Sequence, residues 1–290
     1  MENKSLKLLT FNAGLLSVGL FGLTFLEPAP YVRERFSALA PALMASGADI
    51  IALQEVYAPT QQAQLAKLLH DAYPHCAYSP TRCLRPFGAA LMIFSKYPLV
   101  ATRHILFDQV PFDEQICVDK GMIIASVDIP QLGALTIANT HHTSGGALWN
   151  PEGGLAKRVR SRQYEQLFGV LDAHGGVNRL ALGDFNAGPE ATYDNYAELI
   201  AGKYADAWTM KNGDASRPTW DVKNILNAHG PHQRTSSQRL DHILPHQELL
   251  RRVSISRAQL MFSEPVVPLA DGRKVTVSDH YGVMVELQIV

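Results

Sequence analysis

The sequence predicts an α/β (α+β) fold in which paired sheets are covered by helices. Short apolar runs of strand length alternate with longer amphipathic runs along all 290 residues. Strand patterns outnumber helix patterns, and several strand patterns follow one another with no helix between them. A Rossmann sheet would alternate strand and helix throughout, so the pattern favours paired sheets over that fold.

Nine strands are expected, several of which alternate apolar and polar residues as half-buried strands do. They cover residues 6–12, 50–54, 89–95, 100–107, 122–129, 135–140, 179–183, 240–244 and 282–289. Helices are expected over residues 31–46, 60–72 and 155–173. In the first helix, Val32, Phe36, Leu39 and Leu43 recur at helical spacing, and Pro41 should kink or interrupt it.

Composition narrows the class of protein. A hydrophobic content of 47% excludes a disordered chain, and 26 Lys and Arg against 27 Asp and Glu give a formal charge of −1. No basic run is present, which counts against a strong nucleic-acid footprint. No linker divides the chain, so a single domain over residues 1–290 is expected, and we expect a monomer. A domain of this length needs no metal in order to fold, so any metal site would be functional.

Residues 13–26 form an uncharged stretch that contains nine apolar residues and follows Lys4 and Lys7. It resembles a signal peptide and is too short to span a membrane as a helix, which takes about 20 apolar residues. Cleavage after it would remove the strand over residues 6–12, so an internal, flexible apolar loop and a cytoplasmic location are favoured over export. Cys76, Cys83 and Cys117 lack zinc spacing, and Cys76 and Cys83 could pair only in an exported protein.

Polar side chains gather at the ends of the predicted strands, where ligands usually bind in layered sheets. The series consists of Asn12, Gln54-Glu55, Thr140-His141-His142, Asp184, Asn186, Asp241 and Asp279-His280. Each member has a structural alternative, such as a turn for Asn12, an Asx turn for Asp184 and Asn186, or a packed histidine for His141 and His142. Together they form an oxygen-rich, sulfur-poor set that suits a hard cation such as Mg²⁺.

These motifs, in this order, resemble the endonuclease/exonuclease/phosphatase superfamily, which has the deoxyribonuclease-I-like fold. The matching pieces are Thr10-Phe11-Asn12, Leu53-Gln54-Glu55-Val56, Thr140-His141, Gly183-Asp184-Phe185-Asn186, Leu240-Asp241-His242 and Ser278-Asp279-His280. They extend over nearly the whole chain. The resemblance implies a four-layer αββα sandwich of two packed mixed sheets flanked by helices, and a metal-assisted phosphoester hydrolase.

Within that superfamily the chain is most similar to the neutral sphingomyelinases. This similarity rests on Phe-Ser-Lys-Tyr-Pro at 94–98, Lys-Gly at 120–121, Pro-Thr-Trp-Asp at 218–221 with Asn224, and Ser-Asp-His-Tyr at 278–281. Inositol phosphatases carry Trp-Cys-Asp-Arg where this chain has Arg-Leu-Asp-His at 239–242, and abasic-site endonucleases carry tyrosine at the place of His141. Both branches are therefore disfavoured.

The resemblance implies roles for the oxygen ligands. Glu55, assisted by Asn12, would hold Mg²⁺, with Mn²⁺ or Co²⁺ as substitutes. Asp279 would ligate the same ion or a second one. Asp184 would orient or deprotonate the attacking water, and Asn186 would donate a hydrogen bond to the phosphate.

The same resemblance assigns the histidines to the phosphoryl group. His280 would contact it with a tautomer fixed by Asp241, and His141 would stabilise the transition state or protonate the leaving oxygen. Which histidine is the acid and which the base stays open. Lys120 is either a phosphate contact or an exposed structural lysine.

Two tryptophans and residues 13–26 are candidates for contact with lipid. Trp220 could face a quaternary ammonium group through a cation–π contact, although a core position is the favoured alternative. Trp149 and residues 13–26 could touch a membrane surface. The expected function is a phosphodiesterase of sphingomyelinase type acting on a lipid, with a nuclease or small-molecule phosphodiesterase or phosphatase, and a binding protein without turnover, as the alternatives.

Overall fold

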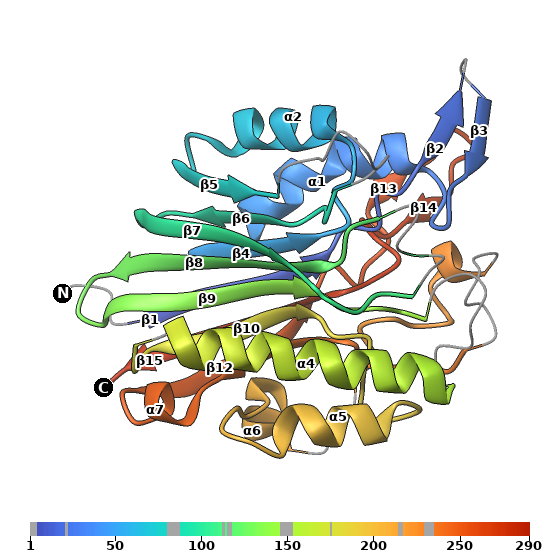
Figure 1. Cartoon of the computed structure of the whole chain (residues 1–290). Coiled ribbons are helices and arrows are strands. Elements are labelled where there is room, and N and C mark those ends of the chain that lie inside the picture. Colours follow the sequence, from blue (N-terminus) through green and yellow to red (C-terminus); the bar gives the residue numbers. More distant parts are fainter. Residues whose placement is uncertain are drawn as a thin grey trace.

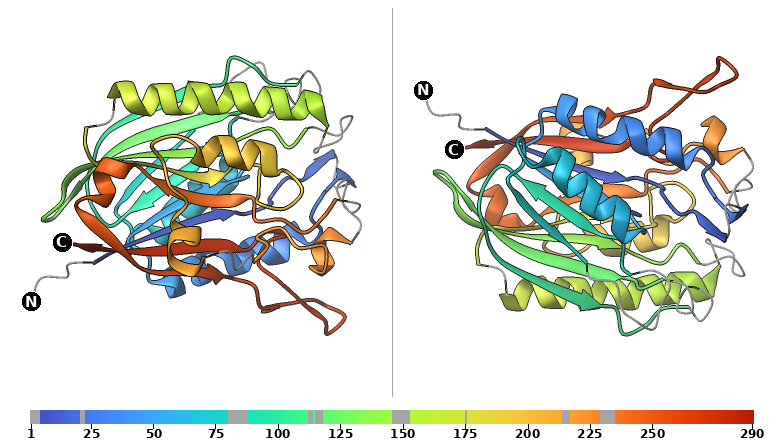
Figure 2. Two further views of the ribbon diagram at one scale, coloured as in Figure 1. Left: turned by 90° about the horizontal axis from the view of Figure 1, so that it is seen from below. Right: turned by 90° about the horizontal axis from the view of Figure 1, so that it is seen from above.

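Two large sheets pack face to face with helices on their outer sides (Figure 1). The computed structural model describes residues 5–20, 23–79, 88–111, 114, 118–145, 153–174, 176–213, 217–228 and 235–290. Among these residues, no helix is both long and apolar enough to cross a membrane. Ser5, the first described residue, pairs with Gln288, so the two ends of the described chain lie on the same side of the molecule (Figures 1 and 2).

The first sheet has six strands in the order β12-β15-β1-β4-β6-β5. Their bounds are β1 (Ser5–Asn12), β4 (Ile50–Gln54), β5 (His75–Tyr78), β6 (Met92–Ser95), β12 (Val253–Met261) and β15 (Gly282–Ile289). Of the neighbouring strand pairs in this sheet, β1–β4 is parallel and the others are antiparallel. The sheet is therefore mixed, as expected.

The second sheet has five strands in the order β11-β10-β9-β8-β7. Their bounds are β7 (Leu99–Leu106), β8 (Gly121–Ile129), β9 (Gly133–His141), β10 (Arg179–Asp184) and β11 (Asp241–Pro245). Here β9 and β10 form the parallel pair. Two small two-stranded sheets lie apart from these, one of β2 (Val18–Leu20) and β3 (Leu23–Leu26), the other of β13 (Val267–Pro268) and β14 (Lys274–Val275).

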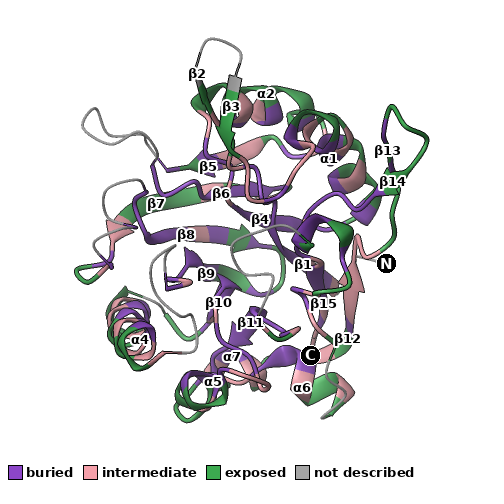
Figure 3. Ribbon diagram, turned by 90° about the vertical axis from the view of Figure 1, so that its right-hand side faces the viewer, coloured by how far each residue is buried: buried purple, intermediate pink, exposed green. Residues whose placement is uncertain are grey.

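Helices cover both outer faces. The helices α1 (Val32–Ser46) and α2 (Pro59–Leu69) lie over the six-stranded sheet, and α4 (Gly154–His174) and α5 (Tyr193–Ile200) lie over the five-stranded sheet (Figure 3). The short α6 (Ala207–Asn212) packs on β11 and β12, α7 (Gln247–Leu250) on β10 and β12, and a 3₁₀ turn, η1, spans Ile225–Asn227. The predicted four-layer αββα sandwich is thus confirmed.

The alternation of residues along the strands explains the layers. Leu6 and Leu8 of β1 face the second sheet, whereas Leu9 and Phe11 face α1 and α2. Successive strand residues point to opposite faces, so a strand buried on both sides is apolar throughout. A third cluster, which includes Leu167, fills the space between α4, α5 and the five-stranded sheet.

All nine predicted strands and all three predicted helices are present, with ends that differ by a few residues. Two strands of the six-stranded sheet, β5 and β12, were not predicted, and neither were the four short strands β2, β3, β13 and β14. Along β12 most side chains are exposed or half-buried, so little apolar periodicity marks it. The predicted interruption at Pro41 is wrong, because α1 runs through this residue. Proline has no N–H to donate to the Ser37 carbonyl, but both residues are exposed to solvent, where water can satisfy that carbonyl.

The prediction of a flexible loop over residues 13–26 is wrong. Ala13 and Leu15 are buried, and the following residues pair as the β2–β3 hairpin. This hairpin projects from the body of the protein (Figure 1). Cys76 lies on β5, and because Cys83 and Cys117 lie outside the described residues, their pairing stays untested.

A buried ion pair joins α6 to β11. The guanidinium of Arg239 donates to the Asp206 carboxylate and to Nδ1 of His242, and Nε2 of His242 donates to the Ala187 carbonyl. Arg239, Asp206 and His242 are each at least 96% buried. Burial raises the pKa of Asp206, but its contacts with His242 and with the Arg239 guanidinium outweigh burial and lower that pKa.

We predict that Asp206→Ala lowers the free energy of unfolding by about 3–5 kcal/mol, because it leaves the Arg239 charge buried without a partner. The control is Glu165→Ala, which removes a carboxylate that pairs with Arg162 on the exposed face of α4 and should cost about 0–1 kcal/mol. Urea titrations followed by circular dichroism would measure both. Equal losses in the two variants would contradict the prediction.

Candidate active site

The predicted polar residues meet at one rim of the two sheets, the rim that Figure 3 views face-on. The strands β1, β4, β9 and β10 end at this rim, whereas the antiparallel strands β8, β11 and β15 begin there or just beyond it. The carboxyl ends of some strands therefore lie beside the amino ends of others. This arrangement explains how residues far apart in the sequence come to one place.

Strand register orders one row of the site. Gly121, His141, Asp184 and Asp241 are successive partners across β8, β9, β10 and β11. His141 Nε2 lies 3.5 Å from Asp184 Oδ2. Because the register of a buried sheet is set by its apolar pattern, the pattern that forms the core also aligns these side chains.

Asn12 joins the two sheets at the rim. Its Nδ2 donates to Glu55 Oε1 at 3.0 Å and to Asp184 Oδ2 at 2.9 Å, and its Oδ1 accepts from the Gly14 amide. Glu55 follows β4 with a φ of +59° and is half-buried. The amide of Asn12 thus holds two carboxylates together, and Oδ1 keeps one lone pair.

Asp184 and Asn186 form an Asx turn and also line the site. Asp184 Oδ1 accepts from the Asn186 amide at 2.9 Å, while Asn186 Nδ2 donates to the His142 carbonyl. Gly183 has a φ of +147°, and a Cβ there would lie 2.0 Å from the Thr140 carbonyl oxygen in β9. The two readings of the Gly-Asp-Phe-Asn motif are therefore compatible.

His280 is held by Asp241, as the sequence predicts. Nδ1 of His280 lies 2.9 Å from Asp241 Oδ2, and its Nε2 lies 4.0 Å from Asp184 Oδ2. Burial alone lowers the pKa of His280, but the Asp241 carboxylate outweighs burial and raises that pKa to about 10. Nδ1 is thus the donor to Asp241, which leaves Nε2 turned toward Asp184.

Lys120 is buried beside His141, so the alternative of an exposed structural lysine is wrong. Its Nζ donates to His141 Nε2 at 2.8 Å and to the His142 carbonyl at 3.2 Å. Burial lowers the pKa of His141 well below its usual value, and the Lys120 ammonium lowers it further. His141 is therefore neutral in this structure and accepts at Nε2.

His142 is a packing residue, as its alternative reading proposed. Its ring stacks on Phe185 with a centroid distance of 5.0 Å and also contacts Phe107 and Tyr164. Neither ring nitrogen has a hydrogen-bond partner among the described residues. Burial lowers the pKa of His142 well below its usual value, so the ring is uncharged.

Asp279 is positioned by three polar side chains that sequence reasoning did not assign to it. The Ser278 hydroxyl lies 3.0 Å from Asp279 Oδ1 and 2.7 Å from the Asn12 carbonyl oxygen. Asn224 and Asn227 donate to the main-chain carbonyl of Asp279. The motif around Asn224 was visible in the sequence, but its contact with this segment was not.

Two groups of side chains could hold a cation. Glu55, His141 and Asp184 form one, and Asp184, Asp241 and His280 form the other, with the ligand atoms of each group within 4.8 Å of one another. Asp279 belongs to neither group, although its charge, after burial, raises the pKa of Glu55.

Burial and the Asp241 charge raise the pKa of Asp184 to about 7, against opposing effects of His280 and Asn12. Such facing carboxylates fit a hard divalent cation, which would offset their repulsion.

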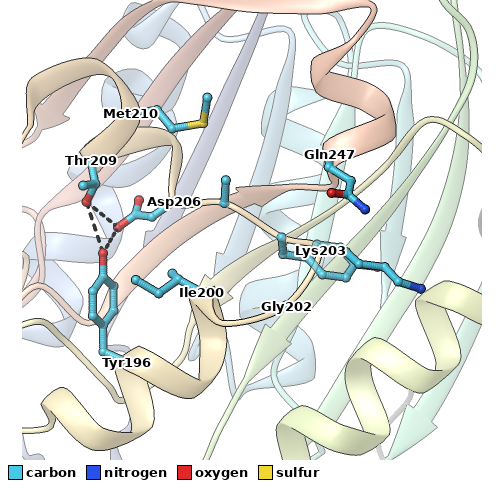
Figure 4. Close-up of a pocket in the computed structure, with 10 residues that line it drawn as sticks. Tyr196, Ile200, Gly202, Lys203, Asp206, Thr209, Met210 and Gln247 are labelled. Atoms are coloured by element: carbon cyan, nitrogen blue, oxygen red, sulfur yellow. Dashed lines mark hydrogen bonds between the residues drawn. The ribbon is translucent and has the colours of Figure 1, made fainter.

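The ligand contacts predicted for the two tryptophans remain untested, and the structure contains a separate cavity away from the rim. Trp220 is buried and pairs through its main chain with His280, so its packing alternative is favoured and a ligand contact stays a prediction. Trp149 lies outside the described residues. A cavity of about 380 Å³, lined by residues of α5, α6 and α7 and the segments next to them, including Tyr196 and Asp206, contains none of the predicted site residues (Figure 4).

Comparison with known proteins agrees with this geometry. A curated relative, a putative neutral sphingomyelinase of Drosophila melanogaster, is 25% identical over an alignment of 294 positions, which covers 97% of this chain. The chain spans 62% of the length of that relative.

Solved structures share the fold. Sphingomyelinase C of Streptomyces griseocarneus superposes with a TM-score of 0.73 at 22% identity, covering 97% of this chain and 99% of the other. Beta toxin of Staphylococcus aureus with bound magnesium ions gives 0.70 at 16% identity, covering 97% and 99%. TDP2 of D. rerio complexed with a single-strand DNA product gives 0.69 at 21% identity, covering 98% and 99%.

The family model described as endonuclease/exonuclease/phosphatase matches residues 9–280, which include every polar residue of the rim described above. These residues, the four-layer sandwich and the solved structures that share it all agree. The chain therefore belongs to the endonuclease/exonuclease/phosphatase family, whose members are metal-dependent phosphodiesterases with the deoxyribonuclease-I-like fold.

Proposed function

We propose that this chain is a Mg²⁺-dependent phosphodiesterase that releases a phosphocholine-type headgroup from a sphingolipid by attack of water on phosphorus. The observation that carries the hydrolytic part is the convergence of Glu55, Asp184 and His141 from both sheets, beside the His280–Asp241 pair. Similarity to a putative neutral sphingomyelinase supports the lipid substrate.

Glu55 and Asp279, with the free lone pair of Asn12 Oδ1, would hold the cation. Mg²⁺ takes one or two protein carboxylates and completes its shell with water and phosphate oxygens, and Mn²⁺ or Co²⁺ would substitute for it. When bound, the ion would polarise a phosphoryl oxygen and offset the negative charge that develops on the phosphoryl and leaving oxygens. The charge of Asp279 already acts on Glu55, which supports a shared ion.

The two histidines flank Asp184. His141 lies on its β9 side at 3.5 Å, and His280, bound to Asp241 of β11, approaches Asp184 at 4.0 Å. In an in-line displacement a proton leaves the attacking water on one side of phosphorus, and a proton reaches the leaving oxygen on the other. Histidines on both sides of one carboxylate suit this requirement, with Asp184 orienting the water or accepting its proton.

Lys120 and Asn186 supply the hydrogen-bond donors proposed for the phosphate. Lys120 is buried next to His141, and Asn186, which is half-buried, keeps one N–H of its side-chain amide beyond the bond to His142. Buried charged donors bind anionic oxygens more strongly than exposed ones. We therefore assign both to phosphate binding.

The β2–β3 hairpin would contact the lipid surface. Phe25 is 68% exposed and Leu26 is 50% exposed, and the hairpin continues from β1, which ends at Asn12. Exposed aromatic and aliphatic side chains on a projecting element favour a bilayer interface. This narrows the expected contact of residues 13–26 to the hairpin, since Ala13 and Leu15 are buried.

A nuclease is the second candidate. The fold is shared with TDP2 complexed with a single-strand DNA product, and the rim chemistry would serve either substrate. The formal charge of −1 and the lack of a basic run favour the lipid.

We predict that the purified protein releases phosphocholine from sphingomyelin micelles with Mg²⁺ and stops in EDTA. Asp184→Asn should lower the rate about 10²–10⁴-fold because it removes a group that acts on the attacking water. The control Asp172→Asn changes an exposed carboxylate and should keep the rate. Phosphatidylcholine, a soluble aryl phosphodiester and single-stranded DNA are assayed in parallel. Hydrolysis of DNA but of no lipid would replace this proposal with the nuclease.

We predict that a double variant, Phe25→Asp with Leu26→Asp, weakens binding to sphingomyelin-containing vesicles at least about tenfold, because each apolar side chain contributes about 1.5–3 kcal/mol when buried in lipid. Sedimentation with vesicles measures binding, and hydrolysis of the soluble aryl phosphodiester should be unchanged. Val100→Asp alters an equally exposed residue of β7 and serves as the control. Equal loss of binding and soluble hydrolysis would show that the hairpin supports the core instead.

A further inference from the structure

Arg35 is fully buried on α1 and uses every N–H of its guanidinium on main-chain carbonyls. Nε donates to Pro30 at 2.9 Å, Nη1 to Ala13 at 3.0 Å and Val277 at 3.3 Å, and Nη2 to Gly14 at 2.7 Å and Ala29 at 2.8 Å. An arginine side chain has five N–H groups, so no donor is left over. The guanidinium therefore acts as a hub between main-chain segments.

The five carbonyls belong to three segments that meet behind the site. Ala13 and Gly14 follow Asn12 at the end of β1, Ala29 and Pro30 lead from the β2–β3 hairpin into α1, and Val277 immediately precedes Ser278 and Asp279. One of these contacts joins residues 242 positions apart. A single side chain thus connects the segment that carries Asn12 with the segment that carries Asp279.

Gly14 transmits this contact to the proposed ligands. Its amide donates to Asn12 Oδ1, and its φ of +55° brings its Cα so close to Asp279 that an added Cβ would lie 2.0 Å from Oδ1. Arg35 binds the carbonyl of the same residue. A shift of residues 13–14 away from Arg35 would therefore disturb the hydrogen bond that orients Asn12 and the close packing of Gly14 on Asp279.

A packing role alone does not explain an arginine at this position. Burial of a guanidinium is costly, and an apolar side chain on α1 would fill the space without that cost. The charges of Asp279, Glu27 and Glu55 act on Arg35 in the opposite direction to burial, which lowers its pKa. Two of the charges that stabilise Arg35, those of Asp279 and Glu55, thus belong to the site.

We propose that Arg35 is a positioning residue that fixes Asn12 and Asp279 for binding of a divalent cation, through the main chain of residues 13–14 and 277. This rests on the proposed function in one respect, namely that these two residues face the ion. Through Ala29 and Pro30, the same guanidinium also anchors the base of the hairpin to the site.

Arg35→Lys tests the proposal, because lysine keeps the charge but has one nitrogen with three donors and cannot reach three segments. The Mg²⁺ dissociation constant, measured by isothermal titration without substrate, should rise about tenfold or more. With the soluble aryl phosphodiester, kcat should fall while KM changes less than about twofold. Arg33→Lys, at an exposed position of the same helix, is the control and should match the unaltered protein in both measurements.

The outcomes separate this proposal from the proposed function. If Arg35→Lys is folded by circular dichroism and binds Mg²⁺ as the unaltered protein does, with the same kcat, Arg35 only supports the fold and the proposal is overturned. If the unaltered protein binds Mg²⁺ but hydrolyses no diester, the proposed function fails, whereas a weaker Mg²⁺ titration of Arg35→Lys still supports the positioning role. If the unaltered protein binds no divalent cation, both fail. Arg35→Met removes the charge as well, and if it does not fold, Arg35→Lys carries the test by itself.

Discussion

The chemistry of this protein depends on side-chain amides that cross from one sheet to the other. At the rim, Asn12 of β1 donates to Asp184 of β10. Between the same two sheets, Gln54 Nε2 of β4 donates to Asn139 Oδ1 of β9 at 2.8 Å. Asn139 in turn donates to the Leu53 and Met92 carbonyls of the opposite sheet. Apolar contacts between sheets are not directional, whereas these hydrogen bonds require one lateral position. They therefore determine whether Glu55 of one sheet meets Asp184 and His141 of the other.

The same rim contains several charged groups that are largely buried, and burial of charge by itself destabilises a fold. Glu55, Asp184 and Asp241 are surrounded by His280, Lys120 and Arg35, and each of these cations is itself at least 94% buried. Burial raises the pKa of Glu55 and Asp184, and neighbouring carboxylates raise them further. Clusters of perturbed groups at the end of a sheet are typical of catalytic sites. A bound cation would favour the charged form of the carboxyl groups, which burial opposes.

Most of the sandwich could be predicted because its strands are short apolar runs with a period of two. Strand ends could be read as well, since polar residues such as Asn12, Asp184 and Asp241 directly follow or begin such runs. The β12 strand was not predicted because most of its side chains are exposed or half-buried. The β2–β3 hairpin was not predicted because its glycines and apolar residues fit a loop equally well. Lys120 was ambiguous, since burial of one lysine leaves no mark on the local sequence.

The sequence by itself determined the fold class, the family and the residue types at the rim, because these follow from local periodicity and from short motifs in a constant order. Only the tertiary structure decided that Lys120 lies against His141, that His142 is a packing residue, and that Arg35 holds residues 13–14 and 277 together. Each of these depends on hydrogen bonds or ring contacts between segments distant in the chain. Such contacts are set by the docking of whole layers, which no local pattern encodes.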